Sequence, residues 1–239
     1  GHKTLRFFSH PVNLKIFDKQ NWMTNEKPLW FIEKHLYRIR HFPIVTKNQI
    51  AALRRTDSLT VISAYLKSRA GRLGYRGPLA IIPNGVDTRK FQVSMPTGRQ
   101  ASFKFQVEKK EKTTLITISR LVKKNAVGDV IEALPYLPDV EFWMLGDGEE
   151  SSKLKAQTSN LGVSDRVKFF GSVPNEKIPE YLAQADIFIR PSLSEGQGIS
   201  FLAAMATGVP VGGTPVGGIT DFLRDGDTGL FCRPHDPQS

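Results

Sequence analysis

The sequence is poor in cysteine, with Cys232 as its single thiol among 239 residues. One thiol cannot form an internal disulfide or a thiolate cluster, so a disulfide-stapled secreted domain and a zinc ribbon are both excluded. The cysteine content predicts a protein of the reducing cytoplasm.

Long hydrophobic runs are also missing. The longest apolar stretch, Gly198–Gly213, is interrupted by Ser200, Thr207 and Pro210, and it falls short of the roughly 18 apolar residues that a membrane span needs. Residues 1–9 lack the apolar centre of a signal peptide. With 40% apolar residues, the chain can still bury a core, and we expect a globular protein.

Acidic residues are scarce in the first part of the chain. Through Thr97 there are 17 Lys and Arg against 5 Asp and Glu, a net charge of +12, whereas the remainder carries −2 and the whole chain +10. An excess of one sign suits nucleic acid, an anionic membrane surface or phosphorylated substrates. A solvated basic surface is an equally good interpretation of this charge.

Motifs for metal binding and for serine hydrolysis are absent from the sequence. The five histidines never fall at metal-ligand spacing with a carboxylate or cysteine, and no Gly-x-Ser-x-Gly segment is present. Asp225-Gly226-Asp227 is best interpreted as a surface turn rather than a carboxylate pair for a metal. We therefore expect no metal site.

Beyond residue 112, short apolar runs alternate with longer amphipathic stretches. Helical spacing of apolar residues predicts helices over Val127–Leu134 and Asn175–Ala185, the second with Asn175 as its N-cap. The predicted strands are Thr114–Ser119, Val140–Leu145, Val167–Phe170, Ile187–Arg190 and Pro210–Gly212. Strands alternating with helices predict an α/β domain with a parallel sheet covered on both faces, which binds ligands at the carboxyl ends of its strands.

The first part follows the same pattern near its end, where strands Leu59–Ile62 and Leu79–Ile82 flank a predicted helix, Ala64–Leu73. Residues 93–112 have no apolar period and end in a charged run, which indicates a linker. The predicted organisation is a partial N-terminal domain over 1–92, a linker over 93–112 and a C-terminal domain over 113–239.

Glycine-bearing turns follow three of the predicted strands, at Gly146-Asp147-Gly148, Glu195-Gly196-Gln197-Gly198 and Gly212-Gly213. Glycine allows a backbone to approach an anion closely, and a helix starting after Gly198 would direct free N–H groups at a phosphate. Glycine also simply closes strand-to-helix turns, so each turn alone has two interpretations.

Three cations, Arg120, Lys123 and Lys124, lie just past the end of the predicted strand Thr114–Ser119. Arginine grips phosphate oxygens with two parallel hydrogen bonds and lysine adds a point charge, so this group suits a diphosphate. Solvated cations at a helix start are the weaker interpretation, because they oppose the helix dipole.

Six segments together resemble glycosyltransferase family 4, the group 1 glycosyltransferases of the GT-B superfamily. They are Ile82–Phe91, Ser119–Lys124, Gly146–Gly148, Phe170-Gly171, Pro191-Ser192 with Glu195–Gly198, and Ala204–Pro210. Their order and separations match the family, and the resemblance extends over residues 46–229. Six ordered motifs are far more specific than a single glycine pattern.

The resemblance implies two Rossmann-like domains, with an acceptor in the N-terminal one and a nucleotide-sugar in the C-terminal one. It implies transfer with retention, without metal or other cofactor, from a donor of UDP or GDP type to a saccharide or lipid-linked acceptor. Arg120 and Lys124, with Lys123 as the alternative lysine, would stabilise charge on the diphosphate, and Glu195 would address sugar hydroxyls. The further donor-binding residues would be Gly146, Asp147, Gly148, Gly171, Gly196, Gln197, Gly198 and Ile199.

Two substitutions and the length of the chain depart from the family pattern. Ala203 stands where a second glutamate would hold the ribose. The loss of that carboxylate could cost about 2–4 kcal/mol of donor binding. Gln197 replaces a common aromatic residue. We expect a fragment with the remnant of an N-terminal domain and without the last helices of the C-terminal domain, and with no secure counterpart of the family's active-site histidine.

The function expected is therefore glycosyl transfer, with an inactive homologue or a nucleotide-sugar-binding module as the alternative because of Ala203. A nucleic-acid binder, in which aromatic side chains such as Trp22 and Trp30 stack on bases, is the least favoured class. The expected location is the cytoplasm, where the basic N-terminal part could hold the protein at the inner membrane face by about 1 kcal/mol per cation.

Overall fold

The computed structural model describes residues 50–53, 55–91 and 112–239. The chain divides into an N-terminal unit, Gly1–Asn84 with the loop Ser194–Gln197, and a C-terminal unit, Gly85–Leu193 with Gly198–Ser239. Of the predicted linker only Lys112 is among the described residues. Trp22 and Trp30 lie outside the described residues.

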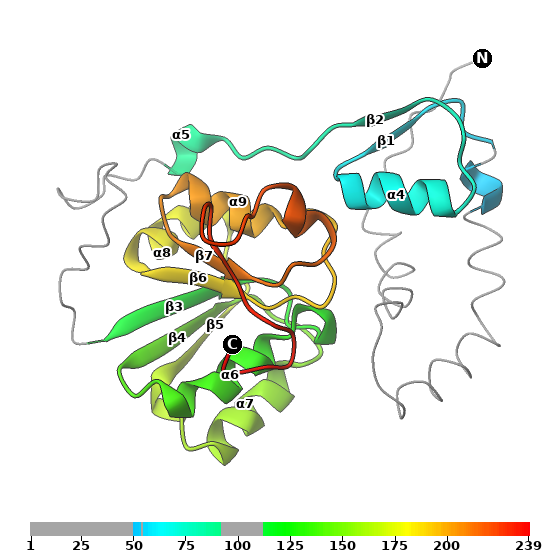
Figure 1. Ribbon diagram of the computed structural model, residues 1–239. Coiled ribbons are helices and arrows are strands. Elements are labelled where there is room, and N and C mark those ends of the chain that lie inside the picture. Colours follow the sequence, from blue (N-terminus) through cyan, green and yellow to red (C-terminus); the bar gives the residue numbers. More distant parts are fainter. Residues whose placement is uncertain (1–49, 54, 92–111) are drawn as a thin grey trace, which may run out of the picture. The chain divides into compact units, whose positions relative to one another are not determined.

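The N-terminal unit contains a strand–helix–strand motif (Figure 1) made of β1 (Leu59–Val61), α4 (Ala64–Arg72) and β2 (Leu79–Ile81). The strands pair in parallel, as a crossover through a helix requires. Ser63 has extended backbone and its hydroxyl accepts from the Leu66 N–H at 3.2 Å, which caps α4. The predicted elements are confirmed to within one residue.

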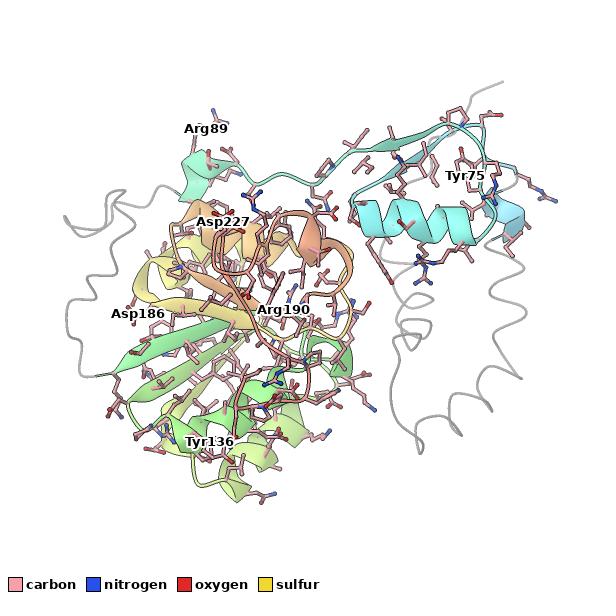
Figure 2. The ribbon with its side chains drawn as sticks, viewed as in Figure 1. Tyr75, Arg89, Tyr136, Asp186, Arg190 and Asp227 are labelled. Atoms are coloured by element: carbon pink, nitrogen blue, oxygen red, sulfur yellow. The ribbon has the colours of Figure 1, made fainter. Side chains whose placement is uncertain are left out.

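A small apolar core supports this motif. Its buried members are Leu53, Leu59, Val61, Ala70 and Tyr75. The Tyr75 hydroxyl donates to the Pro78 carbonyl at 2.8 Å, so the buried ring keeps a partner for its polar end (Figure 2).

In residues 112–239 the C-terminal unit forms a six-stranded sheet with the order β5-β4-β3-β6-β7-β8. Each strand pairs in parallel with its neighbour, which confirms the predicted parallel sheet. The strands are β3 (Thr113–Ile118), β4 (Val140–Leu145), β5 (Val167–Gly171), β6 (Ile187–Arg190), β7 (Val211–Gly213) and β8 (Leu230–Phe231). The sequence analysis missed β8, because two residues with an exposed Leu230 carry no periodic signal.

Helices cover both faces of this sheet (Figure 1). The helices are α5 (Thr88–Phe91), α6 (Val127–Ala133), α7 (Ser151–Asn160), α8 (Ile178–Gln184) and α9 (Ile199–Ala206). Phe142 and Met144 pack with α6 and α7 on one face, while Leu145 and Phe188 pack with α8 and α9 on the other. Short 3₁₀ turns occupy Lys123–Asn125, Leu134–Tyr136, Ser164–Arg166, Asn175–Lys177 and Gly217–Asp221.

The start of α8 differs from the prediction. Asn175 begins a 3₁₀ turn instead of capping the helix, and α8 starts at Ile178 without a side-chain cap. Pro179 occupies the first turn, where its fixed φ suits the helix and its missing N–H is not needed. The Asn175 cap was therefore wrong, whereas the buried face with Ile178 and Leu182 is confirmed.

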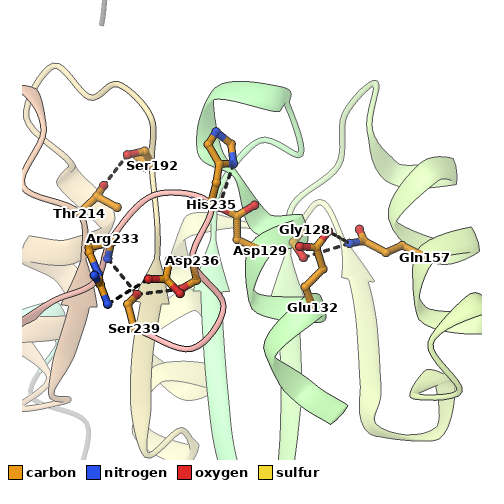
Figure 3. A network of polar contacts seen from close by, with 10 residues as sticks. All are labelled: Gly128, Asp129, Glu132, Gln157, Ser192, Thr214, Arg233, His235, Asp236 and Ser239. Carbon is orange, nitrogen blue, oxygen red and sulfur yellow. Dashed lines mark hydrogen bonds and ion pairs between the residues drawn. The ribbon is translucent and has the colours of Figure 1, made fainter. Parts of the chain in front are cut away.

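The last residues of the chain pack against the beginning of α6 (Figure 3). The His235 N–H donates to Asp129 Oδ2 at 2.9 Å, and its Nδ1 lies 3.4 Å from the same oxygen. Arg233 pairs with Asp236 at 3.0 Å and compacts the segment. Just before it, partial burial raises the pKa of the Cys232 thiol to about 11. In the described ranges no helix has the length and apolar character of a membrane span.

Candidate functional site

The carboxyl edge of the six-stranded sheet carries most of the predicted site residues. In the C-terminal unit these are Arg120, Lys123, Lys124, Gly146, Asp147, Gly148, Gly171, Gly198 and Ile199. Glu195, Gly196 and Gln197 are grouped with the N-terminal unit.

The basic loop, Ser119–Asn125, follows β3 and is held by hydrogen bonds to two of its backbone carbonyls. The Asn125 side chain is buried and its Nδ2 donates to the Arg120 carbonyl at 2.6 Å. The Leu193 N–H, from the loop after β6, donates to the Lys124 carbonyl at 2.7 Å. Arg120 and Lys123 are exposed and Lys124 is half-buried. The backbone that carries these cations is thus fixed while the cations lie at the surface.

Sequence reasoning missed Asn125. The signal that could have found it is an amide directly after two lysines, just before a predicted helix. The following residue, Ala126, adopts the left-handed region at φ 47°, which costs about 1–2 kcal/mol for a side chain other than glycine. The Asn125–Arg120 hydrogen bond closes the loop directly before this strained residue.

The glycines after β4 pack against the basic loop. A Cβ atom at Gly146 would lie 1.8 Å from the Ser119 carbonyl oxygen, and one at Gly148 would lie 2.2 Å from the Leu121 carbonyl oxygen. The Leu121 N–H donates to the Asp147 carbonyl at 3.0 Å. Close backbone packing therefore accounts for both glycines, and contact with a donor stays a prediction for them.

Asp147 has partners within its own turn. Its Oδ1 accepts hydrogen bonds from the Ser151 hydroxyl and, at 2.7 Å, from the Gly148 N–H. These bonds, that from Ser151 first, hold the pKa of the exposed Asp147 carboxyl below its usual value. The carboxylate thereby stabilises the start of α7, a role that the sequence analysis did not assign to it.

The ends of three strands are joined at this edge. The Ser119 N–H donates to the Leu145 carbonyl at 3.0 Å, and the Gly146 N–H donates to the Gly171 carbonyl at 2.7 Å. Gly171 has φ +66°, which lets the chain turn away directly after β5. The structure thus brings the basic loop, the Gly146–Gly148 turn and Gly171 together at the carboxyl ends of three neighbouring strands.

Helix α9 begins beside the end of β6. Gly198, at φ +93°, precedes the helix, and its first turn contains no acidic residue. Ile199 is 46% exposed, and the first N–H groups of a helix have no partner within the helix. The start of α9 therefore has the polarity that an anion requires.

Glu195 and Gln197 belong to a loop with internal hydrogen bonds. Glu195 Oε1 accepts from the Gly196 N–H at 2.9 Å. Gln197 is buried, and its amide bonds to both backbone groups of Asn84, accepting from the N–H at 2.8 Å and donating to the carbonyl at 3.0 Å. A side chain that replaces the family's aromatic residue thus ties this loop to Asn84.

Ala203, in the second turn of α9, is buried among apolar side chains that include Phe188 and Phe201. Its methyl group offers no acceptor for ribose hydroxyls, as the sequence analysis expected. Asp225 and Asp227 lie in a turn with Gly226 at φ +73°, which confirms the surface turn. Within the described ranges no three His, Cys, Asp or Glu side chains gather as potential metal ligands.

Comparisons with known proteins show the family of the chain. Residues 98–239 match the family described as "Glycosyl transferases group 1". The chain is 34% identical over 194 residues to a GDP-mannose-dependent α-(1-6)-phosphatidylinositol monomannoside mannosyltransferase of Mycolicibacterium smegmatis, covering 74% of this chain and 50% of that protein. It is 38% identical over 125 residues to N-acetyl-α-D-glucosaminyl L-malate synthase of Bacillus anthracis, covering 51% of this chain and 32% of that protein.

Solved structures share the fold. Anabaena HepE in complex with UDP and glucose superposes with a TM-score of 0.71 at 23% identity, covering 82% of this chain and 54% of that one. Sucrose-phosphate synthase from Thermosynechococcus elongatus also gives a TM-score of 0.71, at 21% identity, covering 84% of this chain and 51% of that one. The chain spans about half the length of the curated relatives in the first comparisons. On the family match and the sequence identity to its relatives, the chain belongs to the group 1 glycosyl transferases, with the α/β architecture of the GT-B fold.

Proposed function

We propose that this chain contains the donor site of a glycosyltransferase that moves a sugar from a nucleoside diphosphate to an acceptor. The observation that carries the proposal is the basic loop, which Asn125 and Leu193 hold at the carboxyl edge of the sheet through the Arg120 and Lys124 carbonyls. Ligands of open parallel sheets bind at this edge. The family of the chain supports the same function.

The chemistry proposed for these residues is stabilisation of the leaving group. When the bond between the anomeric carbon and the diphosphate breaks, the bonding electrons stay on the diphosphate oxygen. The acceptor hydroxyl oxygen bonds to that carbon, and its proton passes to the departing diphosphate. Arg120 and Lys124 would face the growing negative charge, with Lys123 as the alternative lysine. Glu195 would accept hydrogen bonds from the sugar hydroxyls, and the N–H groups at Gly198 and Ile199 would meet the phosphates.

The donor is proposed to be of UDP or GDP type. The name of the mycobacterial relative specifies GDP-mannose, and the Anabaena neighbour was solved with UDP. Retention of configuration and independence of metal and other cofactors belong to the proposal as well. A nucleotide-sugar-binding module without transfer is the second candidate, favoured by the buried methyl group of Ala203 in place of a ribose acceptor.

A saccharide or lipid-linked acceptor is proposed, and the relative acting on a phosphatidylinositol monomannoside supports the lipid-linked kind. The basic N-terminal part would then serve contact with an anionic inner membrane face, since α4 presents exposed Lys67 and Arg72. We expect the protein to sediment with anionic vesicles at low salt. If it stays in the supernatant, the proposed membrane contact is refuted.

A thermal-shift panel with UDP, GDP, ADP and their sugar conjugates tests the donor site. A ligand at 100 times its dissociation constant stabilises a protein by about 2.7 kcal/mol, so even weak binding is measurable at millimolar nucleotide. We expect a shift for UDP or GDP that Arg120→Ala, Lys124→Ala loses. The matched control, Lys112→Ala, Lys168→Ala, removes the same charge from the residue before β3 and from β5, and should keep the shift.

Transfer is then measured as release of the nucleoside diphosphate from the sugar conjugate, with and without EDTA. Release unaffected by EDTA supports a metal-independent transferase. Binding without release, in the presence of sugar and lipid acceptors, supports the binding module. Absence of any shift would refute the donor site itself.

A further inference from the structure

One buried cation at the site edge has no part in the scheme above. Arg190, the last residue of β6, is 6% exposed (Figure 2). Its Nε donates to Ser192 Oγ at 3.1 Å, and its Nη1 donates to Ser200 Oγ at 2.9 Å and to the Ile118 carbonyl at 3.3 Å. The guanidinium carbon lies 4.9 Å from the centre of the Phe201 ring.

These contacts reach three elements that border the proposed donor site. Ile118 ends β3 and directly precedes the basic loop, while Ser200 is in the first turn of α9. Ser192 lies in the loop after β6, and its carbonyl accepts from the Thr214 hydroxyl, which follows β7 (Figure 3). One side chain thus connects the end of β3, the loop after β6 and the start of α9.

Arginine has a specific advantage at such a position. Its planar group carries five N–H donors in a rigid fork and can stack on an aromatic ring, whereas a lysine ammonium is a compact charge on a flexible stem. A buried cation is costly unless its donors are satisfied. If this position served packing alone, an apolar side chain would suit it better. The arginine therefore points to a role in positioning the elements that it contacts.

We infer that Arg190 is a positioning residue for the donor diphosphate, an inference that rests on the proposed function. By binding Ser200 and the Ile118 carbonyl together, it holds the first N–H groups of α9 at a constant distance from the basic loop. The two halves of the phosphate site, N–H groups on one side and Arg120 with Lys124 on the other, then need no rearrangement to bind a diphosphate. Preorganisation of this kind raises affinity because less order is lost on binding.

The chain offers a matched control in Arg166. Its guanidinium also binds backbone carbonyls, those of Leu137 at 2.6 Å, Leu134 at 3.0 Å and Val140 at 3.2 Å, but at the opposite, amino edge of the sheet. Arg190→Lys and Arg166→Lys each keep the charge and lose the fork. Both should lower stability, and only Arg190→Lys should weaken nucleotide binding.

The experiment is titration calorimetry of the wild-type chain and both variants with UDP and GDP, with hydrogen exchange of residues 198–201 in the absence of nucleotide. We expect Arg190→Lys to lower the affinity by about tenfold, the effect of one hydrogen bond to a charged group. We also expect it to speed exchange at the start of α9, while Arg166→Lys leaves affinity and this exchange unchanged. If Arg190→Lys does not fold, Ser200→Ala, which removes one partner of the guanidinium, should produce the same pair of changes.

Wild-type affinity in Arg190→Lys, or equal losses in both variants, would overturn the role of Arg190 while leaving the proposed function intact. A wild-type chain that binds neither nucleotide would refute the proposed function, and the positioning role would fall with it. The two failures are distinguishable because only the second appears in the wild-type titration.

Discussion

Replacing Gly148 by alanine tests how tightly the turn after β4 is packed against the basic loop. The added Cβ would lie 2.2 Å from the carbonyl oxygen of Leu121, 2.7 Å from its carbonyl carbon and 2.9 Å from its nitrogen. All three are backbone atoms, so no side-chain rotation relieves the overlap and the basic loop itself must shift. Overpacking of this kind costs about 1–3 kcal/mol.

Thermal unfolding with and without nucleotide measures both consequences. For a chain of this size, 1–3 kcal/mol corresponds to a melting temperature lower by about 2–12 °C. We expect nucleotide stabilisation to fall as well, because the displaced segment lies next to Arg120. In the control, Gly71→Ala, the new Cβ meets no atom within 4 Å and lies in α4, so stability should rise by about 0.5–1 kcal/mol. A Gly148→Ala chain as stable as wild type would refute the packing argument.

The remaining predictions concern single side chains. Asn125→Ala leaves the Arg120 carbonyl without its 2.6 Å donor; we expect a loss of about 1–2 kcal/mol in denaturant unfolding together with weaker nucleotide binding, and unchanged affinity would contradict the role of this bond. The lowered pKa of Asp147 means that its contribution to stability is present above the unfolded value near 3.8 and is lost as pH falls through the lower folded value. Asp147→Asn and Ser151→Ala should therefore each make the free energy of unfolding fall less steeply below about pH 4. An unchanged dependence of this free energy on acid pH would contradict the role of Asp147. Burial raises the pKa of Cys232 from 9.0 to about 11, so at pH 8 the folded chain should hold about a hundredfold less thiolate than the unfolded chain. Alkylation of Cys232 should therefore be slow and should become faster in denaturant.

Much of the C-terminal unit follows from local pattern. The runs at Val140–Leu145 and Ile187–Arg190 coincide with β4 and β6, because strands of a parallel sheet covered on both faces are mostly apolar. Helix α8 was recognised from its apolar face, but its cap was not, since Pro179 outweighs the preference of Asn175 for an N-cap.

Other features lay beyond sequence reasoning for a physical reason. The pairing of Leu230 with Gly212 in β8 is visible only when residues distant in the chain meet. The two hydrogen bonds between Gln197 and Asn84 span 113 positions, and neither residue type signals such a partner. Asn125 has a local partner, but the second hydrogen bond that holds the basic loop comes from Leu193, whose N–H donates to the Lys124 carbonyl.

The sequence by itself determined the alternation of strands and helices, the parallel sheet and the family, because apolar periodicity and ordered motifs are properties of short segments. It also showed that Ala203 lacks the expected carboxylate. Tertiary structure decided why the site has its form: Gly146 and Gly148 serve backbone contact with the basic loop, and Arg190 joins three strand and helix ends. Such roles depend on distances between separate elements, which only the packing of the sheet establishes.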